Sequence, residues 1–473
     1  MKKIIYGMVA AVLAVLFLTQ CQQENQEKKA KYVFYFIGDG MGVNQVNGAE
    51  MFLAEQEGRI GIVPFNFTQF PVVNHATTYS KYNSVTCSAA AGTALATGTK
   101  TKNGTIGMDS LRQNPLYSVA VRAQKAGKKV GITTSVSVDH ATPAAFYAHQ
   151  PDRNMCYDIA TDLPKTAFEF YAGSGFLQEK NKKNPEAASV LEIIQDSGYV
   201  IARGVDEFLI KTKETDKMLL MPKVGKSTKS LSYAIDRQED DLTLAQITSS
   251  AIEFLSKKEQ DGFFLMVEGG KIDWACHSND AATVFHEIID FSAAIQEALN
   301  FYQKHPDETL IVVTADHETG GMALGNGPYA LNLKVLQFQQ MSIEKLTTEI
   351  KELRKAKNNQ VVWEDIESLL AKTVGFGSQV KLTEKQLQKL KETYKSSFIG
   401  DQVVLEKNLY ASNEPVAGQA IRILSEIAGI AWASGGHSAG LVPVYAIGAG
   451  ASLFQGKLDN TDIPRKIAEA AGY

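Results

Sequence analysis

The chain has 473 residues, of which 44% are hydrophobic and 21% are charged, which is ample for a large core and more than one ordinary domain on length alone. The formal net charge is −4 and the sequence has no long basic run, which argues against nucleic acid as a specific partner. A small anionic substrate would therefore have to be attracted by local positive charge, such as bound metal ions.

The first 20 residues have the pattern of an export signal, with two lysines before an apolar stretch. That stretch is shorter than the ~20 residues that cross a membrane as a helix. It leads to Cys21 and a polar linker over 21–30, so the start resembles a bacterial lipoprotein signal in which Cys21 is lipidated, although Gln20 departs from the usual small residue. An ordinary secretory signal is the alternative. Both interpretations predict export, and the first predicts a periplasmic or cell-surface protein with a lipid anchor in the membrane.

The remaining cysteines form an odd and sparse set, Cys87, Cys156 and Cys276, which argues against a disulfide framework. We therefore expect free thiols, with stability supplied by the core and by metals. Metal binding by Cys87 or Cys276 is the less favoured alternative.

Apolar, β-branched runs alternate along the chain with helical patterns. Strands are predicted at 32–37, 72–79, 129–136, 262–267, 309–314 and 442–447. Helices are predicted at 88–97, 116–126, 187–197, 243–257 and 280–303. This alternation is typical of an α/β fold, in which a central, mostly parallel sheet is sandwiched by helices.

Two segments depart from this alternation. The segment 205–242 is polar and poorly periodic, which predicts a long surface connection. The segment 331–425 contains charged amphipathic helical patterns without a strand-type apolar run. We predict that it is a helical insertion between two parts of the main domain, 31–330 and 426–473. A solvated structural cap is its favoured role, with substrate access or an oligomer contact as alternatives.

Acidic and imidazole side chains stand next to four of the apolar runs. They are Asp39 in FIGDGMG, Glu268, Asp273 and His277 in VEGGKIDWACH, Asp316 and His317 in TADHETGG, and His437 in SGGHSAG. Because ligands bind at the carboxyl edge of open α/β sheets, we expect these side chains to converge there. So many ligands of this type indicate a cluster of metals rather than one.

Three further residues have suitable chemistry. Ser88 begins a helix of small residues, whose N-terminus favours anions, but a lone serine there is usually an N-cap and is a weak nucleophile without a base or a metal. Thr142 in DHATPAAFYAH offers a hydroxyl that magnesium accepts, and Arg153 can bind a phosphate through two N–H groups. Taken singly, a turn-forming Thr-Pro and a surface arginine are the simpler interpretations.

Together, these motifs resemble the alkaline phosphatase family in order and residue type over 31–330 and 430–450, with the insertion matching loosely. The resemblance implies an alkaline phosphatase-like catalytic domain. It also implies hydrolysis of many small phosphate monoesters to alcohol and inorganic phosphate through a phosphoserine, with two Zn²⁺ and one Mg²⁺ as cofactors. The prediction leaves the oligomeric state open, with a homodimer as one option.

The resemblance also implies a role for each motif residue. Asp273, His277 and His437 would hold the first zinc, and Asp39, Asp316 and His317 the second, with Ser88 as the nucleophile. Asp39, Thr142 and Glu268 would hold magnesium, and Arg153 would bind the phosphate.

Three residues depart from the best-known bacterial pattern. His140 and Trp274 stand where a carboxylate and a lysine often occur, which resembles another branch of the family and leaves the identity of the third metal open. Cys87 replaces the aspartate that usually precedes the nucleophile and pairs with the arginine. We therefore expect Arg153 to be less constrained here.

Two alternative functions fit the sequence less well. A sulfatase or phosphodiesterase of the same superfamily is disfavoured, because the sequence around Ser88 lacks the formylglycine pattern and a diester would gain little from Arg153. A non-catalytic metal-binding surface lipoprotein is disfavoured because metal binding alone needs neither residue.

Overall fold

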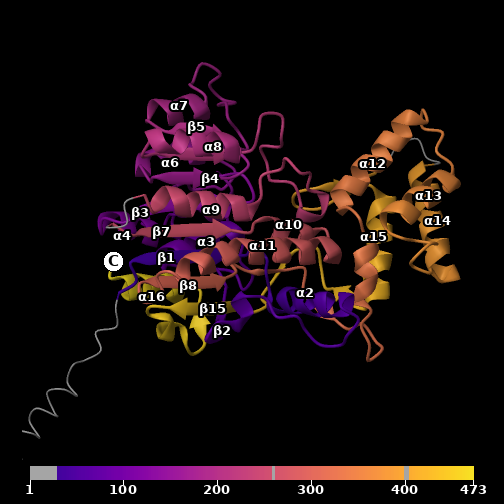
Figure 1. Ribbon diagram of the computed structural model, residues 1–473. Helices are drawn as coiled ribbons and strands as arrows, with labels where there is room; N and C mark the ends of the chain where they lie inside the picture. Colours follow the sequence, from indigo (N-terminus) through magenta and orange to yellow (C-terminus); the bar gives the residue numbers. More distant parts are fainter. Residues whose placement is uncertain (1–28, 258–260, 399–403) are drawn as a thin grey trace, which may run out of the picture.

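The computed structural model describes residues 29–257, 261–398 and 404–473, and its main element is a ten-stranded sheet (Figure 1). The order across the sheet is β16 (Leu458–Asp459), β2 (Val72–Thr77), β15 (Val442–Gly448), β8 (Thr309–Thr314), β1 (Tyr32–Ile37), β7 (Phe263–Glu268), β3 (Lys129–Thr134), β4 (Phe170–Ala172), β6 (Met218–Met221) and β5 (Val200–Arg203). Neighbouring strands are parallel, except that β15 is antiparallel to β2 and β8. The predicted α/β fold with a mostly parallel sheet is confirmed.

The six predicted strands all lie in this sheet, with ends shifted by no more than two residues. Every residue of β1 is buried, as expected for a central parallel strand with a continuous apolar sequence. The short strands β4, β6 and β5 were not predicted. Because β6 falls within 205–242, the prediction of a surface connection is wrong there: its four residues MLLM are buried, but they are too few to show a period among polar neighbours.

Helices cover both faces of the sheet. In chain order they are α2 (Val43–Gln56), α3 (Ser88–Thr97), α4 (Val119–Lys125), α5 (Ala141–Ala144), α6 (Cys156–Thr166), α7 (Val190–Asp196), α8 (Val205–Lys211), α9 (Leu244–Leu255), α10 (Lys271–His277), α11 (Ala281–Tyr302), α12 (Ile343–Ala356), α13 (Trp363–Thr373), α14 (Glu384–Phe398), α15 (Pro415–Ala428) and α16 (Asp462–Ala471). Successive side chains of a strand point to opposite faces. In β1, Phe36 packs against Phe291 of α11, whereas Tyr35 donates a hydrogen bond to the Leu95 carbonyl of α3.

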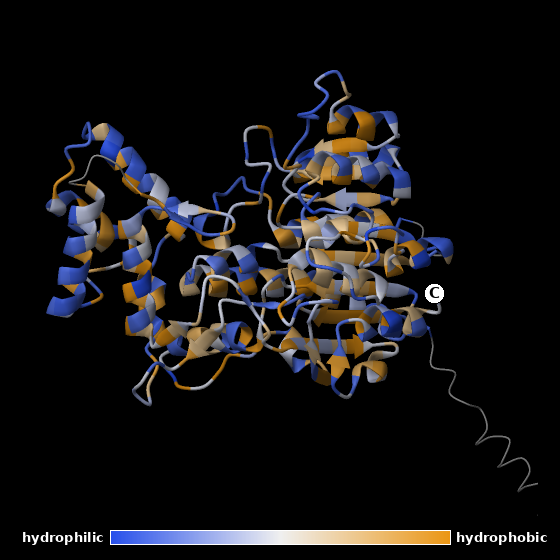
Figure 2. Ribbon diagram, turned by 180° about the vertical axis from the view of Figure 1, so that it is seen from behind, coloured by the Kyte–Doolittle hydropathy of each residue, from blue (hydrophilic) through white to orange (hydrophobic). Residues whose placement is uncertain are grey.

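The segment 331–425 lies to one side of the sheet, where α12, α13 and α14 form the orange group in Figure 1. Figure 2 shows that hydrophilic residues are frequent on these helices, whereas the central strands are largely hydrophobic. The segment also contains a short antiparallel hairpin that the sequence did not predict, β11 (Glu406–Lys407) paired with β12 (Ser412–Asn413). Two residues per strand are too few to produce a strand-type apolar run.

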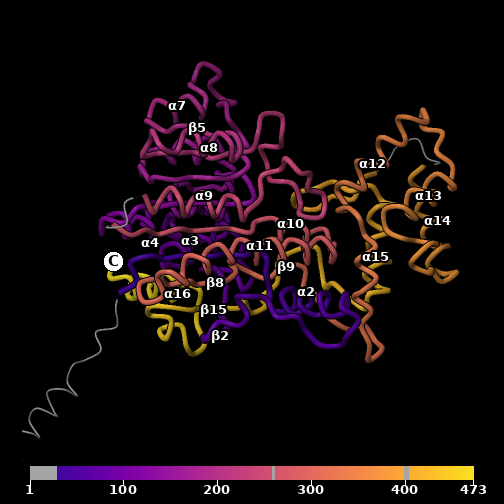
Figure 3. Tube along the Cα trace, viewed as in Figure 1, coloured from indigo at the N-terminus to yellow at the C-terminus, as the bar shows by residue number. Residues whose placement is uncertain are grey.

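The register of the central strands determines where the polar motifs lie. Ile37, the last residue of β1, pairs with Glu268 of β7 and with Thr314 of β8. Glu268 also pairs with Thr134 of β3. The segments that follow these strands therefore leave the sheet at one edge. In Figure 3, α10 and β9 (Glu318–Thr319) lie between the sheet and the insertion.

The predicted signal and Cys21 lie outside the described residues. Among the residues that are described, no helix has both the length and the apolar character needed to span a membrane. Cys87, Cys156 and Cys276 are free thiols, as expected.

Candidate active site and metal centre

Asp39, Asp316 and His317 meet at the carboxyl ends of β1 and β8. His317 Nε2 lies 3.4 Å from Asp39 Oδ1 and 3.3 Å from Asp316 Oδ2. The backbone amides of Gly40 and His317 both donate to Asp316 Oδ1, at 3.2 and 2.8 Å, which fixes the carboxylate. In the described residues Oδ2 accepts no hydrogen bond. The three side chains are fully buried and form one potential ligand set.

A second group contains Asp273, His277 and His437. The first two lie four residues apart on α10 and so share one face of the helix, with His277 Nε2 3.3 Å from Asp273 Oδ2. His437 comes from β14 (His437–Ser438), which pairs with β9 so that His437 is opposite Thr319. Its Nε2 lies 3.2 Å from His277 Nε2 and 3.8 Å from Asp273 Oδ1.

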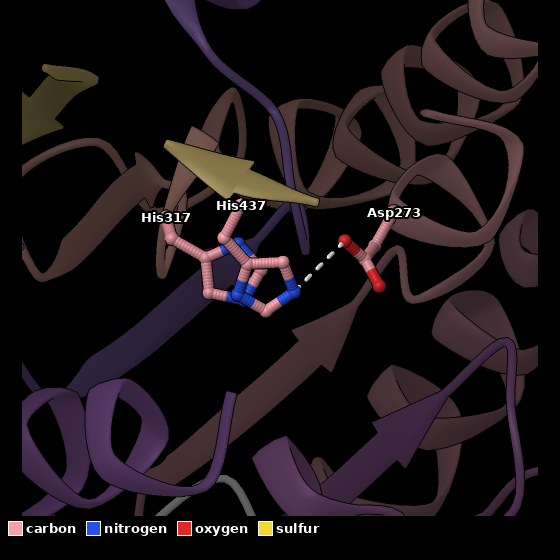
Figure 4. Close-up of side chains that lie close together, drawn as sticks. All are labelled: Asp273, His317 and His437. Atoms are coloured by element: carbon pink, nitrogen blue, oxygen red, sulfur yellow. Dashed lines mark ion pairs between the residues drawn. The ribbon is translucent and has the colours of Figure 1, made fainter. Parts of the chain in front are cut away.

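The two groups adjoin each other. Figure 4 shows the stacked imidazole rings of His317 and His437, whose centroids are 3.6 Å apart, with Asp273 opposite them. Ligand atoms of these three residues all lie within 4.8 Å of one another. The site can therefore hold metals at neighbouring positions.

Hydrogen bonds at the far ring nitrogens orient all three imidazoles. Nδ1 of His277 donates to the Gly435 carbonyl at 2.6 Å, and Nδ1 of His437 donates to the Thr86 carbonyl at 2.9 Å. Since a carbonyl only accepts, the proton is on Nδ1 and the Nε2 lone pair faces the site. Nδ1 of His317 lies 3.2 Å from the hydroxyl of Thr319, which in turn donates to Asp273 Oδ1 at 2.6 Å.

A third group lies on the other side of Asp39. Its carboxylate, that of Glu268 and a ring nitrogen of His140 have ligand atoms within 4.8 Å of one another. The Thr134 hydroxyl donates to Glu268 Oε2, and the hydroxyl of Thr142 is buried beside the same carboxyl group. His140 is thus placed to bind the third metal directly, whereas the sequence located it only beside that metal.

Burial and mutual repulsion make three of the four carboxylates reluctant to ionise, whereas the neighbouring His277 holds the pKa of Asp273 well below its ordinary value. Burial, and then the neighbouring Asp316, Asp273 and Glu268, raise the pKa of Asp39 well above its ordinary value. Burial also raises the pKa of Glu268 to about 8, and burial followed by repulsion from Asp273 raises that of Asp316 to about 7. At least one oxygen of each of these four carboxylates has no hydrogen-bond partner in the described structure. Divalent cations would satisfy both the charges and the unpaired oxygens.

The imidazoles of His317 and His140 are in the form that binds metals. Burial, and then the adjacent His437, lower the pKa of His317 well below its ordinary value. Burial and Arg153 lower the pKa of His140 to about 3. Both rings are therefore neutral near pH 7. Neutral imidazole with carboxylate suits zinc, while carboxylate with a hydroxyl suits magnesium, so the donor sets fit the predicted cofactors.

Ser88 is the first residue of α3 and is fully buried. The N-cap position belongs to Cys87, so the interpretation of Ser88 as an ordinary N-cap is wrong. Its Oγ lies 3.2 Å from His317 Nε2, directly beside the group formed with Asp39 and Asp316. The predicted nucleophile therefore lies at the predicted second zinc site.

Arg153 is held by its backbone amide, which donates to the Gly104 carbonyl at 2.8 Å. Its Nη2 lies 3.4 Å from His140 Nε2 and 3.4 Å from the hydroxyl of Tyr410. Within the described part of the chain, no carboxylate lies within salt-bridge distance of the guanidinium. The Cys87 Sγ accepts a hydrogen bond from the Gly104 amide at 3.1 Å.

Comparison with known proteins decides the family. The profile described as Alkaline phosphatase matches residues 30–187 and 191–473, which is nearly the whole chain. The chain belongs to the alkaline phosphatase family. It is thus an enzyme that hydrolyses phosphoric monoesters, as predicted, and the alternative of a non-catalytic lipoprotein is wrong.

The relatives of this alkaline phosphatase cover most of its length. "Alkaline phosphatase 3" of Bacillus subtilis (strain 168) is 30% identical over 463 residues, covering 96% of this chain and 92% of that protein. A cold-active alkaline phosphatase from Shewanella sp. is 28% identical with a TM-score of 0.76 and covers 93% of this chain and 99% of that one. A mutant of the TAB5 alkaline phosphatase, from an Antarctic bacterium, has Mg bound in its M3 site; it is 25% identical with a TM-score of 0.66, over 95% of this chain and 99% of that one.

Three residues around the site of this alkaline phosphatase were missed by the sequence analysis. Thr319 lies two residues after His317 in a recognised motif, and Thr134 lies near the end of the strand predicted at 129–136, so position alone could have drawn attention to both. Tyr410 lies in the insertion, and no pattern near it pointed to the site. Its ring stacks on Trp274, with centroids 4.6 Å apart and an interplanar angle of 13°.

Proposed function

We propose that this alkaline phosphatase hydrolyses a broad range of phosphate monoesters through a phosphoserine on Ser88, with two zinc ions and one magnesium ion in the site. The observation that carries the proposal is the position of the Ser88 hydroxyl. It lies at the N-terminus of a helix, 3.2 Å from His317 Nε2 and beside the buried carboxylates. A buried hydroxyl at a helix N-terminus, among metal ligands, is suited to attack an anionic phosphoryl group.

Three ligand sets would hold the metals. The first zinc would be bound by Asp273, His277 and His437, the second by Asp39, Asp316 and His317, and the magnesium by Asp39, Thr142 and Glu268, with His140 as a further donor. When bound, the zinc pair lowers the pKa of attacking hydroxyl groups and stabilises the charge on entering and leaving oxygens.

The residues of the chain then perform two displacements. The Ser88 oxygen forms a bond to phosphorus as the bond to the alcohol oxygen breaks; the serine gives up its proton and the alcohol gains one. Arg153 binds the phosphoryl oxygens and keeps the group in line. A water oxygen next displaces Ser88 from phosphorus, which releases inorganic phosphate and restores the hydroxyl. Contacts of this kind recognise the phosphoryl group alone, which supports a broad range of alcohols.

The test of this proposal is turnover of a chromogenic phosphate monoester, phosphate diester and sulfate, before and after chelation of metals. We expect the monoester to be the preferred substrate, with activity lost on chelation and recovered with zinc and magnesium. Preferred hydrolysis of the diester or the sulfate would contradict the proposal.

Replacing Arg153 with alanine is expected to weaken inorganic phosphate binding and monoester turnover more than diester turnover. The guanidinium would neutralise an oxygen charge that a diester lacks, and such a charge-assisted contact contributes roughly 1.5–3 kcal/mol. Kinetics on both substrates measure the difference. Equal losses would show that Arg153 does not discriminate between monoesters and diesters.

Export and lipid anchoring at Cys21 are part of the same proposal, supported by the apolar stretch and polar linker around this cysteine. Each buried CH₂ of an acyl chain contributes ~0.8 kcal/mol, so several chains anchor a protein permanently. Changing Cys21→Ser should move phosphatase activity from the membrane fraction to the soluble exported fraction. Wild-type activity in the soluble fraction, with a mature chain that begins elsewhere, would contradict lipidation.

A further inference from the structure

The β11–β12 hairpin of the insertion brings Tyr410 into the active site. At its tip, Asn408 Oδ1 accepts hydrogen bonds from the backbone amides of Tyr410 and Ala411, at 2.9 and 2.6 Å. Asn408 Nδ2 donates to the hydroxyl of Ser278 at 2.8 Å. Since Ser278 directly follows α10, the hairpin tip is tied to the helix that carries Asp273 and His277.

The base of the hairpin is also held firmly. Glu414, which follows β12, is fully buried; its carboxylate accepts from Arg354 of α12 at 3.0 Å and from the hydroxyl of Ser397 in α14. Its backbone amide donates to Thr347 of α12 at 3.1 Å. Helices of the insertion thus set the position of the hairpin, and the hairpin sets the position of Tyr410.

The Tyr410 side chain meets the arginine of the site. Its ring stacks on Trp274 and makes an edge contact with His277, with centroids 5.4 Å apart. Its hydroxyl oxygen lies 3.4 Å from Arg153 Nη2, a long hydrogen bond that spans 257 residues of sequence. Within the described residues, Nε and Nη1 of Arg153 have no hydrogen-bond partner, so these groups are available to phosphoryl oxygens.

We propose that Tyr410 is a positioning residue for Arg153. The residue before the nucleophile is Cys87 and not a carboxylate, so the arginine has no carboxylate partner at that position. The Cys87 thiol accepts a hydrogen bond from the Gly104 amide instead. The tyrosine hydroxyl takes the role of that missing partner and restrains the guanidinium for phosphate. The helical insertion is thereby part of the phosphate-binding site rather than only a solvated cap. This inference rests on the proposed role of Arg153 in binding phosphate.

The test compares the metal-loaded wild-type enzyme with Tyr410→Phe, which keeps the stacking ring and removes the hydroxyl. The matched control is Leu409→Ala at the same hairpin tip, where the side chain is 59% exposed. We expect Tyr410→Phe to raise the inhibition constant of inorganic phosphate about three- to tenfold, as the loss of one hydrogen bond implies. The diester turnover of Tyr410→Phe should remain at the wild-type value. The inhibition constant of Leu409→Ala for inorganic phosphate should likewise be unchanged.

Two further variants separate positioning from a general structural effect. In an Arg153→Ala background, Tyr410→Phe should weaken phosphate inhibition no further, because the two residues act as one unit. In a Tyr410→Phe background, Cys87→Asp should restore the inhibition by supplying a new partner for the arginine. Additive losses of phosphate inhibition in the double variant, or an unchanged inhibition constant in Tyr410→Phe, would overturn this inference and leave the proposed function standing. A wild-type enzyme that phosphate does not inhibit would overturn the proposed function together with it.

Discussion

Replacing Ser88 with alanine is expected to lower monoester turnover by on the order of a thousandfold or more, while the metals stay bound. The reason is that Ser88 would supply the attacking oxygen, and no other hydroxyl in the described residues is hydrogen-bonded to His317 Nε2. The proposed metal ligands are carboxylates, imidazoles and Thr142, none of which is changed. Metal content by elemental analysis and steady-state turnover together measure both parts of this prediction.

The covalent intermediate gives a second readout for the same variant. Acid quenching during turnover of a phosphate-labelled monoester should leave label on Ser88 of the wild-type protein and none on Ser88→Ala. Ser84→Ala, in the exposed loop just before α3, serves as the matched control and should retain label and turnover. Label trapped on a residue other than Ser88 would contradict the assignment of the nucleophile.

Removing the metals is expected to abolish turnover and to make the folded protein less stable as the pH rises from about 7 to about 9. In the metal-free protein the pKa values of Asp316 and Glu268 are raised to about 7 and about 8, chiefly by burial. Both groups have ordinary values near 4 when the chain is unfolded. Between pH 7 and pH 9 these two groups hold more protons in the folded state than in the unfolded state, so their contribution to the free energy of unfolding falls with rising pH.

Bound metals should reverse this dependence. Ionised carboxylates bind cations better than protonated ones, so binding strengthens as the pH rises. At a free metal concentration 1,000 times the dissociation constant, binding adds about 4 kcal/mol to the free energy of unfolding. Thermal unfolding with and without a chelator, across the pH range, measures both trends.

Two variants control this experiment. Glu268→Gln replaces a carboxyl group of raised pKa with a neutral amide and should flatten the pH dependence of the metal-free protein. Glu253→Gln, at an exposed position of α9, should leave it unchanged. A metal-free protein that is equally stable at pH 7 and pH 9 would show that these carboxylates do not oppose folding when ionised.

Local sequence patterns determined the centre of the fold and most of the candidate site. The runs that form β1, β7 and β8 are continuous, apolar and six residues long, so each could be recognised without knowledge of its neighbours. Parallel strands place their carboxyl ends at one edge, so motifs that follow such runs are brought together by topology alone. This is why residues as distant as Asp39 and Asp316 could be assigned to one site before any distance was known.

Short elements could not be recognised in this way. The strands β4, β6 and β5 extend the sheet at one edge, but each has only three or four residues and polar neighbours. A sheet edge of this kind forms because the adjacent strand already presents unpaired backbone groups, which is a tertiary condition. The segment 205–242 was therefore mistaken for a surface connection.

The sequence by itself determined the order of the motifs and pointed to the candidate ligands and the candidate nucleophile, because each motif is a short run of consecutive residues. Only the tertiary structure decided that His140 faces the carboxylates of Asp39 and Glu268, and that Tyr410 reaches Arg153. Tyr410 lies on a hairpin of four paired residues within a charged helical segment, and its placement depends on contacts with α10, α12 and α14. No period or motif encodes the contact between Tyr410 and Arg153, which are 257 positions apart. This contact arises from the packing of the insertion against the catalytic domain.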